Sequence, residues 1–145
     1  MKRPYSDPTL MSSPAQYGGF LREASKRGII RFRLRSGRCA VLGVFFVIKK
    51  DGRSLRIIFD TRFLNCEFIP PPSTSLATAA AFGRLETPVD VDTVIGTADV
   101  SNAFYGLGVP QLLSEKFTLE LCPARFCGAV YDDGTVPGPF DLVEP

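Results

Sequence analysis

The amino-acid sequence predicts a single domain of the α+β class, and three local patterns point to that class. Residues 15–27 fit a short helix that ends at Gly28. Residues 30–35 alternate apolar and basic side chains, as a half-buried strand does. Two further apolar runs, 41–48 and 55–60, flank a tight turn and predict a β-hairpin. With 145 residues, 45% of them apolar, the chain is large enough to bury one core.

The first predicted element is the short helix, and an irregular lead precedes it. Residues 1–14 hold three prolines and show no apolar periodicity, so we expect this lead to be flexible. The helix follows over residues 15–27. Gly28 suits the position just after its last turn, because glycine adopts the left-handed conformation there without steric cost.

The second predicted element is a strand over residues 30–35 with one wholly basic face. Ile30, Phe32 and Leu34 occupy alternate positions and can face a core. The positions between them are all arginines, so three cations point the same way: Arg31, Arg33 and Arg35.

The β-hairpin over residues 41–60 is the strongest local prediction. Its turn contains Asp51 and Gly52, and an Asp-Gly pair supplies the positive φ angles of a tight hairpin turn. On the return strand, Arg56 and Asp60 are four residues apart and therefore share a face.

A second helix and a buried strand are expected after the three prolines at 70–72. Ser73 or Thr74 can cap a helix that runs to about Leu85 through an alanine-rich stretch. A loop leads from this helix into an apolar strand that ends at Asp99. Burying a carboxylate there costs several kcal/mol unless the charge is paired or binds a metal ion. Something outside the local sequence should therefore hold the charge of Asp99.

The last predicted elements are one more strand and a tail. Phe117, Leu119 and Leu121 alternate with polar residues, which predicts a strand antiparallel to a neighbour. Residues 128–145 contain glycine, proline and acidic residues in loop proportions, so we expect a loop-rich tail.

Charge is distributed unevenly along the chain, although the net charge is only +2. The segment 26–62 holds eleven of the seventeen basic residues and two acids, a local charge of +9. Such a segment favours a polyanionic partner, that is, a nucleic acid. The chain contains no histidine, which excludes Ser-His-Asp and Cys-His nucleophiles and histidine-ligated zinc. Catalysis would have to use carboxylates, cysteine, lysine or a bound metal ion.

Cysteine usage and hydropathy predict a protein inside the cell, in the nucleus or cytoplasm, with no membrane partner. The four cysteines show no CxxC spacing, so a zinc site is not expected and free thiols are. We find no signal peptide and no apolar run of membrane-spanning length, so the sequence does not predict a secreted protein.

Three segments, in this order, resemble the first half of a reverse transcriptase (RNA-directed DNA polymerase) of the retrotransposon type. They are the basic hairpin with Lys49-Lys50-Asp51-Gly52, the run with Arg56, Asp60, Arg62 and Asn65, and the motif of Asp99 with Phe104. The resemblance covers roughly residues 20–121. It implies a fingers hairpin plus an incomplete palm sheet over residues 15–127, with template-primer (RNA or DNA) and deoxynucleoside triphosphates as partners.

The resemblance also implies a role for Asp99. Nucleotidyl transfer uses two divalent ions with oxygen ligands, Mg²⁺ or Mn²⁺, and a carboxylate at a strand end suits them. By this reading Asp99 is catalytic and a metal ligand, and the backbone carbonyl of Val100 is a second ligand. The structural alternative is that Asp99 caps the helix that follows it.

Nucleotide and nucleic-acid contacts are implied for other residues. Phe104 matches the position whose ring excludes a 2′-hydroxyl, and its alternative role is core packing. Lys49 or Lys50 and Arg56 would hold the triphosphate, or else form a solvated basic surface. The three arginines of the basic strand suit the template or primer backbone. We expect Asp60, Arg62 and Asn65 to brace the hairpin against the palm.

The Tyr-x-Asp-Asp pattern that supplies the second carboxylate pair in this family is missing from the sequence. Residues 131–134, Tyr-Asp-Asp-Gly, lack the intervening residue and the apolar flanks, so we interpret them as an exposed turn. The chain is therefore expected to be an inactive polymerase fragment. The alternatives are a non-catalytic nucleic-acid-binding module and a remnant of a retroelement without function.

Overall fold

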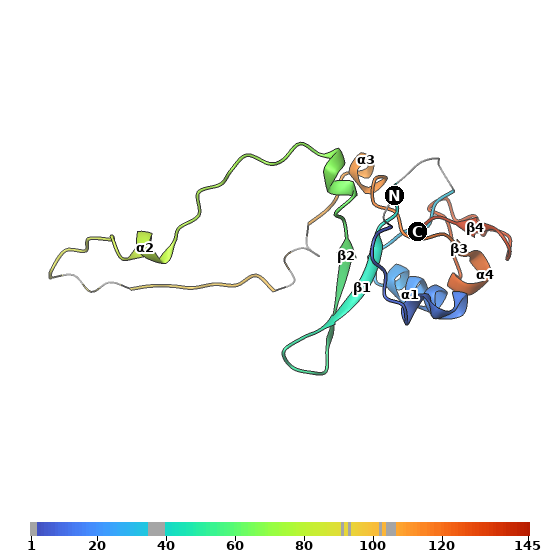
Figure 1. Cartoon of the computed structure of the whole chain (residues 1–145), viewed down its shortest axis with the longest axis horizontal. Coiled ribbons are helices and arrows are strands. Elements are labelled where there is room, and N and C mark those ends of the chain that lie inside the picture. The colour runs from blue at the N-terminus through green and yellow to red at the C-terminus, as the bar shows by residue number, and fades with distance from the viewer. Residues whose placement is uncertain (1–2, 35–39, 91, 93, 102, 104–106) are drawn as a thin grey trace. The chain divides into compact units, whose positions relative to one another are not determined.

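The computed structural model describes residues 3–34, 40–90, 92, 94–101, 103 and 107–145. The chain forms two units, one made of residues 1–68 and 108–145 and the other of residues 69–107. The first unit combines short helices with two antiparallel two-stranded sheets, as Figure 1 shows, which confirms the α+β class. Its elements are η1 (Leu10–Ser12), α1 (Pro14–Lys26), β1 (Gly43–Ile48), β2 (Leu55–Asp60), η2 (Leu64–Glu67), α3 (Gln111–Ser114), β3 (Cys122–Pro123), α4 (Ala124–Cys127) and β4 (Leu142–Val143).

Helix α1 forms where the sequence predicted a helix, and both of its ends have a local cause. The Ser13 hydroxyl oxygen accepts a hydrogen bond from the Gln16 N–H at 3.2 Å, and Pro14 occupies the first turn. The helix ends at Lys26, and Gly28 follows with a φ of +69°, as expected for a glycine after a helix end.

The lead before α1 packs on the hairpin, which differs from the flexible lead that the sequence pattern suggested. The Asp7 N–H donates to the Val44 carbonyl at 2.8 Å. The Tyr5 ring meets Phe45 edge-on, with ring centroids 5.3 Å apart. Gly43 allows this approach, because a Cβ there would overlap the Tyr5 carbonyl. The prolines of the lead could not predict this contact, because the residues that the lead packs on lie much further along the chain.

The β1–β2 hairpin confirms the strongest sequence prediction. Its antiparallel register runs from the pair Gly43–Asp60 to the pair Ile48–Leu55. Gly52 has a φ of +66° in the turn, a conformation that glycine adopts without steric cost.

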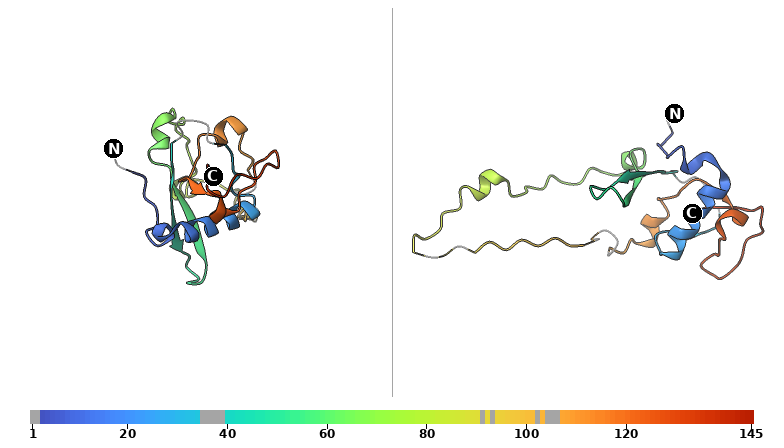
Figure 2. Two further views of the ribbon diagram at one scale, coloured as in Figure 1. Left: turned by 90° about the vertical axis from the view of Figure 1, so that its right-hand side faces the viewer. Right: turned by 90° about the horizontal axis from the view of Figure 1, so that it is seen from below.

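The core of the first unit lies between α1, α4 and the short sheet β3–β4. Helix α1 lies beside α4, as Figure 2 also shows. Phe20 of α1 packs edge-on against Phe46 of β1 and so connects the hairpin to this core. The side chains that are almost completely buried are Leu21, Val44, Leu64, Cys122, Cys127 and Val143.

The predicted basic strand is reduced to two isolated bridges. Phe32 pairs with Tyr131, and Arg33 pairs with Glu144. Leu34, expected to face the core, is exposed, and Arg35 lies outside the described residues. Each bridging partner is a single residue from a different part of the chain, so no continuous ladder extends over residues 30–34.

The C-terminal part differs from its prediction in two ways. Only Thr118 pairs within the run 117–121, and its bridge to Val41 is parallel rather than antiparallel. The tail 128–145 is rich in loops, but it also supplies β4, whose Val143 is completely buried. β4 pairs with β3, so the tail closes one side of the core.

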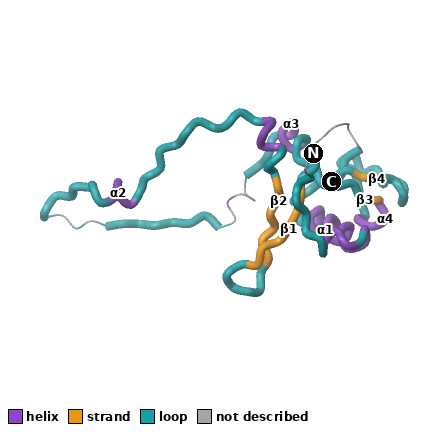
Figure 3. Tube along the Cα trace, viewed as in Figure 1, coloured by secondary structure: helices purple, strands orange, loops and turns teal. Residues whose placement is uncertain are grey.

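In the second unit, the predicted helix and the predicted buried strand are both largely wrong. Helix α2 spans only Ala79–Phe82, and Thr78 caps it instead of Ser73 or Thr74. The described residues of 94–101 form no strand, and Val94 and Ile95 are 91% and 78% exposed. Figure 3 draws most of this unit as loop. An apolar run becomes a strand only when another strand pairs with it, and the described residues supply none here.

Candidate nucleic-acid interface

The turn end of the hairpin gathers four exposed cations: Lys49, Lys50, Arg53 and Arg56. Residues 48–51 and Arg56 line an open hollow of about 440 Å³. No ion pair within the described part of the chain involves any of these four side chains. Their charges are therefore available to an external anion.

Asp51 is the one acid in this turn, and it is used to build the turn. Its Oδ1 accepts hydrogen bonds from the Arg53 and Ser54 N–H groups, both at 2.9 Å. The Ser54 hydroxyl, followed by these two amides, lowers the pKa of Asp51 to about 2. Asp51 is thus ionised at neutral pH, and the segment 49–56 carries a net charge of +3.

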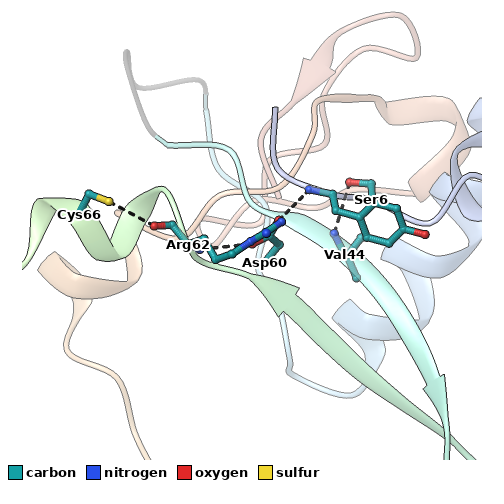
Figure 4. Close-up of polar contacts among 6 residues, drawn as sticks. Ser6, Val44, Asp60, Arg62 and Cys66 are labelled. Atoms are coloured by element: carbon teal, nitrogen blue, oxygen red, sulfur yellow. Dashed lines mark hydrogen bonds and ion pairs between the residues drawn. The ribbon is translucent and has the colours of Figure 1, made fainter. Parts of the chain in front are cut away.

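Asp60 anchors the other end of the hairpin. Its side chain is 3% exposed and accepts two hydrogen bonds from the Arg62 guanidinium, each at 2.8 Å, as Figure 4 shows. The Tyr5 N–H donates to the same carboxylate at 2.7 Å. The hydrogen bonds from Arg62, and then the Tyr5 amide, hold the pKa of Asp60 well below its usual range. Asp60 and Arg62 therefore brace the hairpin against the lead, while Asn65 lies in η2.

The arginines of residues 31–35 do not form one exposed stripe. Arg31 is exposed, with its Nη1 3.9 Å from a carboxylate oxygen of Asp132. Arg33 has a partly buried guanidinium that donates to the buried Glu144 carboxylate and to the Glu115 carbonyl, both at 3.0 Å. The charge of Arg33 is thus engaged inside the protein. Nucleic-acid binding by this segment stays a prediction, and Arg31 is exposed.

Asp99 and Val100 lie in the second unit, and both are exposed in a segment without regular structure. Phe104 lies outside the described residues. Among the residues that the structure describes, no group of three or more acidic or cysteine side chains is placed to bind a metal ion. One carboxylate and one carbonyl would hold Mg²⁺ only weakly, because the ion then keeps most of its waters.

The segment 131–134 forms the turn that the sequence predicted. The Gly134 N–H donates to the Tyr131 carbonyl at 2.9 Å, and Gly134 has a φ of +82°. Asp133 accepts a hydrogen bond from the Thr135 N–H at 2.8 Å, and both aspartates are exposed.

Sequence reasoning missed two structural partners of the charged residues. Ser54 stabilises the ionised Asp51, and Glu144 neutralises Arg33. A serine two residues after an Asp-Gly turn is a local signal that could have been used. Glu144 lies more than a hundred residues from Arg33, and no local pattern indicates that pair.

Three cysteines are described, and all three are free thiols. Cys66 is exposed, whereas Cys122 and Cys127 are buried in the core. Burial raises the pKa of Cys122 to about 12, so its reactive thiolate form is scarce at neutral pH.

Comparisons with known proteins leave the family open: no family model, no curated protein and no solved structure matches the chain. No helix within the described residues is both long and apolar enough to cross a membrane.

Proposed function

We propose that the chain is a fingers-bearing part of an RNA-directed DNA polymerase of the retrotransposon type, and that its β1–β2 hairpin contacts phosphate groups. One observation carries the proposal. Four exposed cations, which form no ion pair with any residue that the structure describes, surround a turn whose only acid accepts hydrogen bonds within the turn itself. Lysine ammonium groups act on phosphates as point charges, and the Arg56 guanidinium offers a planar fork. The motif order in the sequence supports the polymerase assignment.

The proposed ligands are a deoxynucleoside triphosphate at Lys49, Lys50 and Arg56 and a template-primer along the surface that includes Arg31. Asp99 and Val100 would take part in a Mg²⁺ or Mn²⁺ site together with the carboxylates of a Tyr-x-Asp-Asp motif, which this sequence lacks. The chain alone is therefore expected not to incorporate nucleotides.

A non-catalytic nucleic-acid-binding module is the second candidate, and a specific observation favours it. The cationic hairpin, its Asp51 turn and its Asp60 anchor all lie within the first unit, without any contribution from Asp99. Binding by the hairpin would therefore persist in a protein with no polymerase function.

Phosphate binding is tested with the double variant Lys49→Gln/Lys50→Gln and a labelled single-stranded oligonucleotide. Each lost phosphate contact should reduce the slope of log K against log salt by about 0.7, so we expect a reduction of about 1.4. The variant Arg84→Gln/Lys116→Gln is the control, because it removes two exposed cations outside both the hairpin and the basic segment 26–62. Fluorescence anisotropy at several salt concentrations gives the slopes. Equal slopes for the double variant and the unchanged chain would contradict the phosphate role.

The polymerase assignment is tested by fusing the chain to the remaining palm segment of a related enzyme and measuring primer extension. Asp99→Asn should then abolish activity, because the amide keeps the shape but removes the charge. Asp92→Asn, a nearby exposed carboxylate, should leave activity unchanged. An active Asp99→Asn fusion would overturn the metal-ligand role of Asp99. A fusion with Asp99 in place that binds the oligonucleotide but does not extend a primer would favour the non-catalytic module.

A further inference from the structure

Among the residues that the structure describes, none pairs with the outer edge of β2. On β1, the Val44 carbonyl accepts from Asp7, so Val44 directs its backbone groups away from β2. The N–H and carbonyl groups of successive residues in a strand point to opposite edges, so those of residues 44, 46 and 48 all point away from β2. The residues of β2 opposite them in the register point their own N–H and carbonyl groups away from β1. These partners are Phe59, Ile57 and Leu55.

None of the three outward-facing residues of β2 has a hydrogen-bond partner for its outer N–H or carbonyl among the described residues. On β1, by contrast, Val44 is covered by residues 6 and 7, and Leu42 donates to the Thr118 carbonyl. An unpaired strand edge is a template for pairing with another chain.

The same three residues of β2 belong to an apolar face of the hairpin. In the register, the side chains of Leu55, Ile57 and Phe59 share a face with residues 44, 46 and 48, and all six are apolar. The core covers the base of this face, but Ile48 and Leu55 at the turn end are 67% and 59% exposed. An open edge and exposed apolar side chains therefore occur together on β2.

We propose that a second copy of this chain pairs with the β2 edge, antiparallel and about a twofold axis at Ile57. Ile57 then faces Ile57 of the second copy, and Leu55 faces its Phe59. The three pairs at residues 55, 57 and 59 each exchange two backbone hydrogen bonds. The result is a four-stranded sheet in the order β1–β2–β2–β1 with a continuous apolar face. This inference does not rest on the proposed polymerase or nucleic-acid function.

Charge selects this register over its neighbours. With the axis at Ile57, Arg56 faces Ile58 of the second copy, whereas an axis at Arg56 would place two arginines opposite each other. An axis at Ile58 would bring Arg56 to Asp60, whose carboxylate is already occupied by Arg62 and Tyr5. The two cationic turns lie at opposite ends of the sheet, about 40 Å apart at ~3.3 Å per residue, well beyond the ~8 Å screening length at physiological salt.

The test is sedimentation equilibrium of the full chain over a range of concentrations, with Leu55→Lys as the disrupting variant. We expect a monomer–dimer equilibrium in the unchanged chain and a dissociation constant raised roughly tenfold or more by Leu55→Lys, because a charge on a strand edge opposes pairing. Ile48→Lys is the matched control. It is the cross-strand neighbour of Leu55, similarly exposed and on the same face, but it lies on β1 and should leave the dimer intact.

A second measurement covers the case in which Leu55→Lys disturbs folding. In a chain with Cys39 and Cys66 replaced by Ser, Ile57→Cys should form a covalent dimer on mild oxidation, because residues in a hydrogen-bonded pair lie within disulfide reach. Ile48→Cys in the same background should stay monomeric. A chain that is monomeric at every concentration, or that is affected equally by Leu55→Lys and Ile48→Lys, would overturn the proposal. So would covalent dimers of Ile48→Cys but not of Ile57→Cys.

Discussion

Two aspartates fix the two ends of the hairpin, and each acts through its charge. Asp51 organises the turn by accepting two backbone N–H groups, and Asp60 ties the base to Arg62 and to the lead. Hydrogen bonds to an ionised carboxylate are stronger than those between neutral groups, and they lower the carboxyl pKa. The cationic turn thus keeps its shape without losing its positive charge.

Asp60→Asn should lower stability at pH 7 by about 1–3 kcal/mol, because a buried, charge-assisted network loses its anion. The folded-state pKa of Asp60 is depressed, so its contribution is complete above the unfolded value of about 4 and disappears as the pH falls below it. The difference between the two proteins should therefore shrink between about pH 5 and pH 2. Urea unfolding across this range measures it.

The control for this prediction is Asp90→Asn, which replaces an exposed aspartate in the second unit. It should change stability little at any pH. If Asp60→Asn and Asp90→Asn gave the same unfolding free energy at pH 7, the anchoring role of Asp60 would be wrong.

Helix α1 carries two adjacent glycines with opposite surroundings. A Cβ on Gly18 would lie 2.5 Å from the Phe126 Cβ and 2.6 Å from the Phe126 carbonyl oxygen. A Cβ on Gly19 would meet nothing within 4 Å. Gly18 is therefore a packing requirement of the α1–α4 contact, whereas Gly19 only weakens the helix.

Alanine at these two positions should change stability with opposite signs. Gly19→Ala should stabilise the chain by roughly 0.5–1 kcal/mol, because alanine is the better helix former. Gly18→Ala should destabilise it by roughly 1–3 kcal/mol, because α1 and α4 would have to separate. Chemical unfolding of the two variants at one pH decides the matter, and a shared sign would show that the α1–α4 packing is not as described.

Elements with local causes were predictable from the sequence, and elements with distant causes were not. Helix α1 has its cap at Ser13 and its stop at Gly28, and the hairpin has its Asp-Gly turn, so a few neighbouring residues determine both. The strand expected before Asp99 depends on partners that no neighbouring residue supplies, and it is not formed. The same distinction holds for the candidate site. The sequence places the lysines at the hairpin turn, whereas no local pattern predicts the Arg33–Glu144 pair.

The first unit is assembled from two stretches that are far apart in the sequence. The Leu42 N–H donates to the Thr118 carbonyl at 2.8 Å, Arg33 pairs with Glu144, and α1 packs on α4. All of these contacts join residues 1–68 to residues 108–145. The described residues of 69–107, by contrast, are all exposed, and helix α2 among them is only four residues long.

This division predicts how the whole chain responds to a protease. Arg84 is the only lysine or arginine between residues 69 and 107, and it lies in an exposed segment just after α2, so brief trypsin treatment should cut there early. The two products should still migrate as one species in native gel filtration, because noncovalent contacts between residues 1–68 and 108–145 hold them together. In denaturing gels they should separate. Arg84→Gln should remove the early cut while leaving slower cuts at the exposed hairpin turn. If the nicked chain fell apart under native conditions, the contacts between the two stretches would be too weak to define one folded unit.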